Sequence, residues 1–185
     1  KHDRTSPYML LKWIIQIQNG KDMNGNLEGM ICDWSKQHPF DVIYSRSIIW
    51  LKSRTRDNIE MIGSFVKHLE TFWRDDLAWF KLGNLYDEEK EYDRASFSYE
   101  EAYALNPERN EYLTFAAKSR LNIKAETEKE KVENRNIAIK QLAKSVMMNA
   151  QDSLAWQLLI NNTSNEAKKN KYIAYRNLVL KTKTD

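Results

Sequence analysis

The chain has 185 residues, of which 42% are hydrophobic and 30% are charged, and its net charge is +3. Six tryptophans, nine tyrosines and six phenylalanines are too many for a disordered chain, whereas five glycines and three prolines are too few for a β fold with many tight turns. So small a net charge gives no argument for nucleic-acid binding. The composition therefore predicts an all-α protein, either one packed domain or one array of stacked repeats.

Two further classes of protein are disfavoured by simple counts. Cys32 is the only cysteine, so no disulfide can form within one chain and no thiolate metal site is indicated. No apolar run approaches the roughly 20 residues that span a bilayer. The best candidate, residues 8–17, is short and interrupted by Lys12. We therefore expect no direct membrane span.

The first 75 residues predict helical hairpins with weak repeat character. Residues 1–41 contain two apolar helical segments, of which the second ends at Pro39. Residues 42–75 contain another pair of helical segments, and Phe65 stands where a packed aromatic residue occurs in the next hairpin. The other key positions of this pair depart from that pattern, so 42–75 is interpreted as a degenerate repeat.

Residues 76–109 carry an unmistakable repeat signature. Counted from Asp76 as position 1, positions 4, 7, 8, 11, 20, 24, 27 and 32 hold Trp79, Leu82, Gly83, Tyr86, Ala95, Tyr99, Ala102 and Pro107. This is the pattern of a 34-residue tetratricopeptide repeat (TPR), a pair of antiparallel helices. The first four residues share one face of the first helix, and the next three share one face of the second. Small Gly83 and Ala95 allow the two helices to approach closely, and Pro107 ends the second helix.

The rest of the chain predicts two more hairpins. Trp156, in "SLAWQLL", repeats the "DLAWFKL" around Trp79 after 77 residues, which is two periods of 34 plus nine. The middle repeat therefore spans 110–152 with a nine-residue insertion around 122–134, a charged stretch that either lengthens a helix or loops out. Residues 153–185 form a C-terminal hairpin or cap. The predicted fold is an all-α, TPR-like solenoid of helical hairpins, wound as a right-handed superhelix.

A partner-binding surface is expected where the first helices of the repeats line the concave side of such a solenoid. Repeat positions 2, 5, 9 and 12 provide its residues, which are Leu77, Phe80, Asn84 and Asp87, then Glu111, Thr114, Lys118 and Leu121. Repeats that hold a C-terminal carboxylate typically have Lys at position 5, where this chain has Phe80. The mixed apolar and polar lining better suits a helix or loop of a folded protein partner.

Enzymatic chemistry is not indicated. The three histidines lie far apart in the sequence, and neither a phosphate-binding glycine loop nor a nucleophile elbow is present. We therefore expect no catalytic residue, no metal site, no cofactor and no small-molecule substrate. Charge is unevenly distributed, because Asp87–Glu101 carries a net −5 and Glu166–Asp185 a net +4. Such runs usually form solvated helix faces, and a patch that orients a partner is the less common alternative.

The stretch from His38 to Leu113 resembles the TPR-containing second subunit of the endoplasmic reticulum membrane protein complex. "AWFKLGNLY", "YDRASFSYEEAY" and "NP" follow a degenerate hairpin in the order typical of that family. The similarity extends over about 130 residues, from Asn26 to Trp156. An interrupted repeat and a basic terminal helix follow, as in the family.

This resemblance implies a non-enzymatic scaffold, peripheral on the cytosolic face of the endoplasmic reticulum membrane. Its partners would be the other protein subunits of an insertase, which places transmembrane segments in that membrane. The main alternative is a TPR adaptor of another assembly, such as a transferase auxiliary subunit or an RNA-processing scaffold. An enzyme with an unrecognised motif is a third hypothesis.

Overall fold

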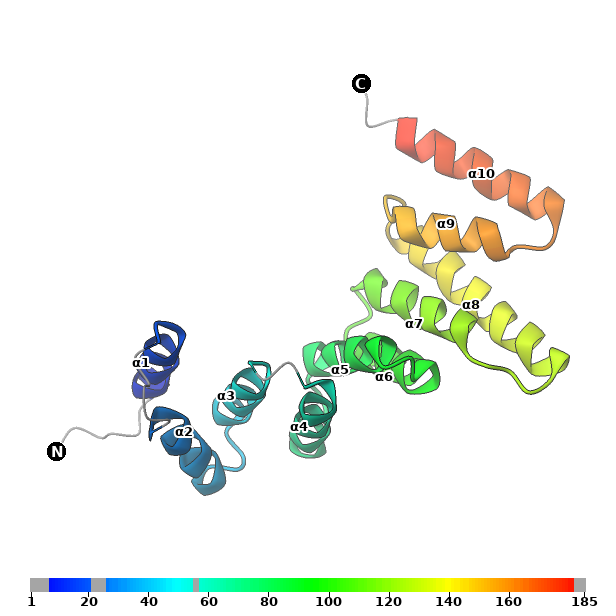
Figure 1. Ribbon diagram of the computed structural model, residues 1–185. Coiled ribbons are helices and arrows are strands. Elements are labelled where there is room, and N and C mark those ends of the chain that lie inside the picture. The colour runs from blue at the N-terminus through cyan, green and yellow to red at the C-terminus, as the bar shows by residue number, and fades with distance from the viewer. Residues whose placement is uncertain (1–6, 21–25, 55–56, 182–185) are drawn as a thin grey trace. The chain divides into compact units, whose positions relative to one another are not determined.

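The computed structural model describes residues 7–20, 26–54 and 57–181, and within these ranges it contains ten α-helices and no strand (Figure 1). The all-α prediction is confirmed. The helices are α1 (Pro7–Gln18), α2 (Asn26–Gln37), α3 (Val42–Lys52), α4 (Asn58–Thr71), α5 (Asp76–Glu88), α6 (Tyr92–Leu105), α7 (Asn110–Asn122), α8 (Glu128–Met148), α9 (Ser153–Asn162) and α10 (Glu166–Lys181). They belong to two compact units, unit 1 (Lys1–Trp73) and unit 2 (Arg74–Asp185).

Unit 1 is built around an apolar cluster shared by α1, α2 and α3. Its buried members are Trp13, Ile17, Ile31, Tyr44 and Leu51. Helix α4 adds Phe65 and Leu69, which are also buried. His68 of α4 is buried too, and its Nδ1 lies 2.7 Å from the hydroxyl oxygen of Ser45 on α3. This histidine therefore has a packing role between two helices.

Unit 2 is a series of helices in which each packs on the next along the chain, from α5 to α10. The helix pairs α5–α6, α7–α8 and α9–α10 form three consecutive hairpins (Figure 1). One core cluster joins α7, α8 and α9 through Ala117, Leu142 and Trp156, among others. Tyr172 of α10 packs against this cluster, with its ring centroid 6.5 Å from that of Trp156. Every hairpin thus buries its apolar face against a neighbour, as stacked repeats must.

The insertion expected around 122–134 is part loop and part helix. Residues 123–127 connect α7 to α8, and α8 then begins at Glu128. Thr127 explains this start, because its hydroxyl oxygen accepts a hydrogen bond from the backbone N–H of Glu130 at 3.2 Å. The carboxylate of Glu130 in turn accepts from the backbone N–H of Glu126 at 2.9 Å. Two N–H groups at the helix end are thereby satisfied, which is the usual role of such residues at a helix start.

The sequence similarity around Trp79 and Trp156 has a counterpart in helix capping. Asp75 caps α5 by accepting a hydrogen bond from the N–H of Ala78 at 3.2 Å, and Asp152 caps α9 by accepting from Ala155 at 2.9 Å. A capping aspartate therefore stands four residues before each of these tryptophans, and α5 and α9 begin in the same way.

None of the helices in the described ranges is both long and apolar enough to cross a membrane. The outermost predicted segments, 1–41 and 153–185, each include residues that lie outside these ranges, namely 1–6, 21–25 and 182–185.

Candidate protein-binding surface

The TPR signature residues pack in the contact between α5 and α6. A methyl group at Gly83 would lie 2.7 Å from both Cδ1 and Cε1 of the Tyr99 ring, so only glycine leaves room for this ring. Tyr99 is buried, as are Ala95 and Ala102 on the same face of α6. Leu82 of α5 is also buried. The two helices therefore approach each other where the sequence has its small residues.

The remaining signature residues differ in burial. Trp156 is 5% exposed, and its indole N–H donates to the carbonyl oxygen of Ala150 at 2.9 Å. Trp79 and Tyr86 are only half-buried, and Pro107 is exposed in the turn after α6. The Trp79 ring meets the ring of Phe97 edge to face, with centroids 6.0 Å apart.

Phe80, a predicted partner-binding residue of α5, lies among three aromatic rings of α6 and α7. Its ring centroid is 4.9 Å from that of Tyr112, 5.4 Å from Phe115 and 5.5 Å from Tyr99. Phe80 is half-buried among these rings. The aromatic residue that replaces lysine at position 5 thus joins α5 to α6 and α7.

Asn84 lies one helical turn after Phe80 and has a polar partner on α6. Its side-chain oxygen accepts a hydrogen bond from the Tyr99 hydroxyl at 2.8 Å. Burial raises the pKa of Tyr99 above its usual value, and the nearby carboxylates of Asp87 and Glu88 raise it further. Tyr99 therefore remains a neutral hydrogen-bond donor over the physiological pH range.

Asp87, a further turn along α5, is bound to α7 by both of its carboxylate oxygens. Lys118 donates to Oδ2 at 2.8 Å, and the Ser119 hydroxyl donates to Oδ1 at 2.8 Å. Lys118 and Asp87 both remain partly accessible to solvent. The ion pair thus provides one positive and one negative group between α5 and α7, in positions set by contacts within the protein.

One residue that was predicted to line this surface is buried instead. Thr114 is 2% exposed, because its hydroxyl donates to Asp152 at 2.7 Å and lies 2.7 Å from the Ser145 hydroxyl oxygen. A partner cannot reach it, so this part of the prediction was wrong. The α5–α7 face consists of the other seven residues, with Leu77 and Glu111 exposed and the remaining five half-buried: Leu77, Phe80, Asn84, Asp87, Glu111, Lys118 and Leu121.

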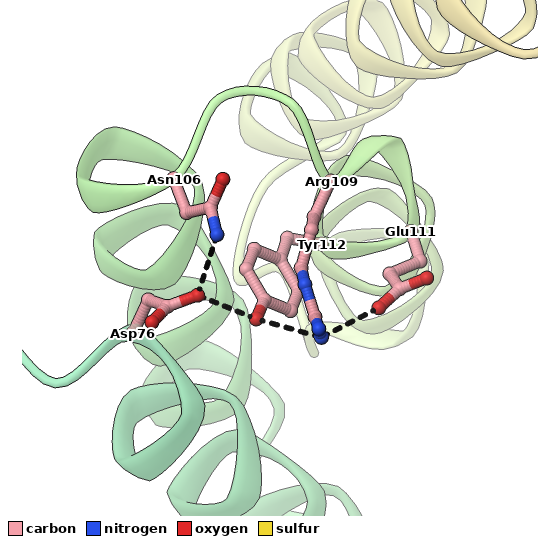
Figure 2. Close-up of polar contacts among 5 residues, drawn as sticks. All are labelled: Asp76, Asn106, Arg109, Glu111 and Tyr112. Carbon is pink, nitrogen blue, oxygen red and sulfur yellow. Dashed lines mark hydrogen bonds and ion pairs between the residues drawn. The ribbon is translucent and has the colours of Figure 1, made fainter.

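A polar network at the edge of this face was not predicted from the sequence (Figure 2). Asp76 Oδ2 accepts hydrogen bonds from the side-chain amide of Asn106 at 3.0 Å and from the Tyr112 hydroxyl at 2.9 Å. Arg109 donates to the Tyr112 hydroxyl oxygen at 3.4 Å and forms an ion pair with Glu111 at 3.2 Å. The network connects the start of α5 with the end of α6 and the start of α7, so it joins one repeat to the next.

The electrostatics of this network follow from its contacts. Burial raises the pKa of Tyr112 to about 12, and the hydrogen bond to the Asp76 carboxylate contributes in the same direction. The pKa of Arg109 is also raised, first by Tyr112 and then by the acidic groups nearby. At neutral pH Tyr112 therefore keeps its proton, and its hydroxyl donates a hydrogen bond to the Asp76 carboxylate.

Asp152 is the centre of a second network, between α7, α8 and α9. Its Oδ1 caps α9, and its Oδ2 accepts from Thr114 and from the side-chain amide of Asn110 at 3.1 Å. The only sequence signal for this network was the aspartate in front of "SLAW", which indicates a helix cap but not the second use of its carboxylate.

The α5–α7 face has features of a protein-binding surface. Among the described residues no group of three or more His, Cys, Asp and Glu side chains could hold a metal ion. The carboxylates of Asp76, Asp87 and Asp152 are each engaged by neighbouring donors. A surface of this kind offers an exposed leucine, ring edges and one ion pair, which are features of protein-binding faces.

Residues 76–109 match the tetratricopeptide repeat family, over the same 34-residue span that the sequence pattern indicated. No curated protein matches the chain. The match covers one hairpin of unit 2, so it identifies a TPR-containing protein without assigning the chain to a particular family of such proteins.

Solved structures extend the likeness over nearly the whole chain. A "MamA RS-1 ArsTM double mutant" has a TM-score of 0.71 at 12% identity and covers 98% of this chain and 97% of its own. "Crystal structure of MamA" gives 0.68 at 13% identity, with 93% and 94% coverage. PilF of Pseudomonas aeruginosa gives 0.61 at 14% identity, with 95% and 77% coverage. Identities this low show the fold alone, and they confirm the TPR-like helical solenoid. A TPR fold is that of a protein-interaction scaffold.

Proposed function

We propose that this chain is a non-enzymatic scaffold subunit of the endoplasmic reticulum membrane protein complex. It would lie on the cytosolic face of that membrane and hold membrane-embedded and cytosolic subunits together while transmembrane segments are inserted. The scaffold role rests on the α5–α7 face. Leu77 and Glu111 are exposed on this face, and its half-buried side chains are already held by contacts within the protein. That face would receive a helix or loop of another subunit.

Preorganisation is what makes this face suitable for binding. Phe80 is held by three rings, Asn84 by the Tyr99 hydroxyl, and Asp87 by Lys118 and Ser119. Ordering side chains on association costs about 0.5–1.5 kcal/mol for each flexible group. Groups that are already ordered avoid much of this cost, so a modest surface can bind with useful affinity.

The choice of complex rests on sequence resemblance. A degenerate hairpin precedes the repeat at 76–109, and a repeat lengthened by a charged segment follows it, in the order typical of the second subunit of that complex. The helices α3–α4, α5–α6 and α7–α8 correspond to these three segments. A TPR fold occurs in many assemblies, so the partner must be identified by experiment.

Affinity capture of the tagged chain from detergent-solubilised cells, followed by mass spectrometry, tests both parts of the proposal. We expect multi-span endoplasmic reticulum proteins in stoichiometric yield with the unchanged chain. The variant Leu77→Glu/Glu111→Lys should lose at least one of them, because it alters the two exposed members of the α5–α7 face. Val132→Glu, at an exposed valine on α8, is the matched control and should retain every partner.

The outcomes separate the two parts. Recovery of only soluble partners, such as a transferase or RNA-processing factors, would refute the membrane complex and leave a TPR scaffold of another assembly. Unchanged capture by the Leu77→Glu/Glu111→Lys variant would show that the partners bind elsewhere on the chain.

A further inference from the structure

Helix α6 carries a stripe in which Asp93 and Phe97 are exposed and Glu101 is half-buried. Asp93, Phe97 and Glu101 are spaced four residues apart, so they lie on one face of the helix. The Phe97 side chain is 55% exposed, and its ring is supported from one side by Trp79. Neither acidic group forms an ion pair among the described residues. We call Asp93, Phe97 and Glu101 the acidic stripe.

Helix α10 carries a stripe of opposite charge. Lys168, Lys171, Tyr175 and Leu178 are spaced three, four and three residues apart, which also places them on one helical face. Tyr175 is 58% exposed and Leu178 is 64% exposed. Within the described ranges, neither lysine forms an ion pair. We call these four residues the basic stripe.

The two stripes lie in different places within unit 2. Helix α6 packs against α5 and α7, whereas α10 packs against α9, and α7–α9 lie between them (Figure 1). The basic stripe contains two large exposed hydrophobic side chains, which are typical of a surface that binds a partner. The stripes do not meet within one chain, but a second copy can offer each stripe its complement.

We infer that the chain associates head to tail with a second copy of itself, the basic stripe of one copy binding the acidic stripe of the next. The spacing supports this pairing, because Lys171 stands four residues before Tyr175 and both acidic residues stand four from Phe97. When Tyr175 of one copy faces Phe97 of the next, Lys171 lies opposite Asp93 if the two helices run parallel. If they run antiparallel, Lys171 lies opposite Glu101. The aromatic contact removes exposed apolar surface from water, and the charges select the partner face and its orientation.

This contact has a defined symmetry. It joins two different surfaces, so each copy that binds through α10 still offers its own α6 to another copy. Heterologous contacts of this kind produce open chains, or rings where the rotation closes. The surfaces are separate from the α5–α7 face, so self-association is independent of the proposed function and can be measured on the purified chain alone.

Sedimentation velocity of the purified full chain tests the inference. We expect a mass that increases with protein concentration at low ionic strength. Raising the salt from 0.05 to 0.5 M should weaken the association by roughly tenfold, because exposed charges are screened. A chain that remains monomeric over the whole concentration range at low salt would overturn the inference.

Two variants identify the surfaces. Asp93→Asn/Phe97→Ser/Glu101→Gln removes the acidic stripe and leaves α10 unchanged, and we expect it to be monomeric. If the loss of Phe97 unfolds α6, which circular dichroism would reveal, Asp93→Lys/Glu101→Lys keeps the ring and reverses the charges instead. Association at the unchanged level in a folded variant would contradict the assigned surface.

The complementary variant is Lys168→Gln/Lys171→Gln/Tyr175→Ser, which should also be monomeric. Mixed in equal amounts, the two removal variants should form a dimer and nothing larger, because each retains only one functional stripe. A mixture that stays monomeric would refute head-to-tail pairing. The charge-matched control Lys124→Gln/Lys140→Gln, at exposed lysines outside both stripes, should associate like the unchanged chain. Loss of association in this control would show that the effect is non-specific.

Discussion

Gly83 and Tyr99 lie against each other where the two helices of the 76–109 repeat meet. The Tyr99 ring cannot move aside easily, because it is buried and its hydroxyl is bonded to Asn84. A methyl group 2.7 Å from two ring carbons must therefore displace either the ring or the helix. The glycine is required here by side-chain volume, and its backbone freedom has no part in this requirement.

Gly83→Ala should lower the free energy of unfolding by about 1–3 kcal/mol, the usual range for overpacking a core. Gly63→Ala is the matched control, because Gly63 lies inside α4 with nothing within 4 Å of the added methyl group. That substitution should raise stability by about 0.5–1 kcal/mol, through helix propensity alone. Urea unfolding followed by circular dichroism measures both. Equal effects of the two substitutions would contradict the packing described for Tyr99.

Tyr112 should make stability fall at high pH. Its pKa is about 12 in the folded protein, against about 10 in an unfolded chain. Below pH 10 both states hold the proton and the stabilisation is complete. Between pH 10 and 12 the unfolded state loses the proton first, so the free energy of unfolding decreases as the pH rises.

Tyr112→Phe should lower the number of protons released on unfolding at high pH by up to one. Some pH dependence of the free energy of unfolding should remain, because the raised pKa of Tyr99 acts in the same direction. At pH 7 the substitution should also cost about 1–2 kcal/mol, since it removes the hydrogen bond to Asp76. Urea unfolding at several pH values between 9 and 12 gives both numbers. An unchanged slope in the variant would mean that Tyr112 ionises equally in both states.

At the scale of helices, Asp152 contributes to α9 in two ways. It caps the helix, and it binds Thr114 and Asn110 of α7. Asp152→Ala should therefore cost about 2–4 kcal/mol, the sum of a lost cap and of buried donors left without an acceptor.

Asp57→Ala is the corresponding control, because Asp57 caps α4 through the N–H of Glu60, as a typical N-cap does. It should cost about 1 kcal/mol. Amide hydrogen exchange in α9 and α4 reports each effect locally. If the loss of protection in α9 is no greater than that in α4, the contacts of Asp152 with α7 contribute nothing beyond the cap.

At the scale of the molecule, unit 2 should open from its C-terminal end. Each helix packs mainly on its neighbours in sequence, and α10 has its main contacts with α9, fewer than those between the earlier helices of this unit. In such one-dimensional stacks the terminal helix has the lowest local stability. Hydrogen exchange followed by mass spectrometry should find the least protection in α10 and the most in α6 and α7. Uniform protection from α5 to α10 would indicate a single cooperative unit instead.

The prediction from sequence succeeded where the spacing of residues determines the structure. The intervals between Gly83, Ala95 and Tyr99 are those of two packed helices, so the fold follows from them. The exposure of Thr114 could not be predicted in this way. Its repeat position predicted an exposed site, yet Ser145 and Asp152, 31 and 38 residues further along the chain, bury it. Contacts at such separations depend on how hairpins stack, and a positional pattern within one repeat does not contain that information.

The two sets of hydrogen bonds made by Asp152 also restrict how α9 can rotate about its own axis. One carboxylate oxygen belongs to the helix start and the other to α7, so α9 cannot turn about its own axis without losing one of the two attachments. The exposed Leu154, two residues later, keeps its direction for the same reason. The carboxylate therefore helps to fix the rotation of α9, together with the buried packing of Trp156 and Leu159.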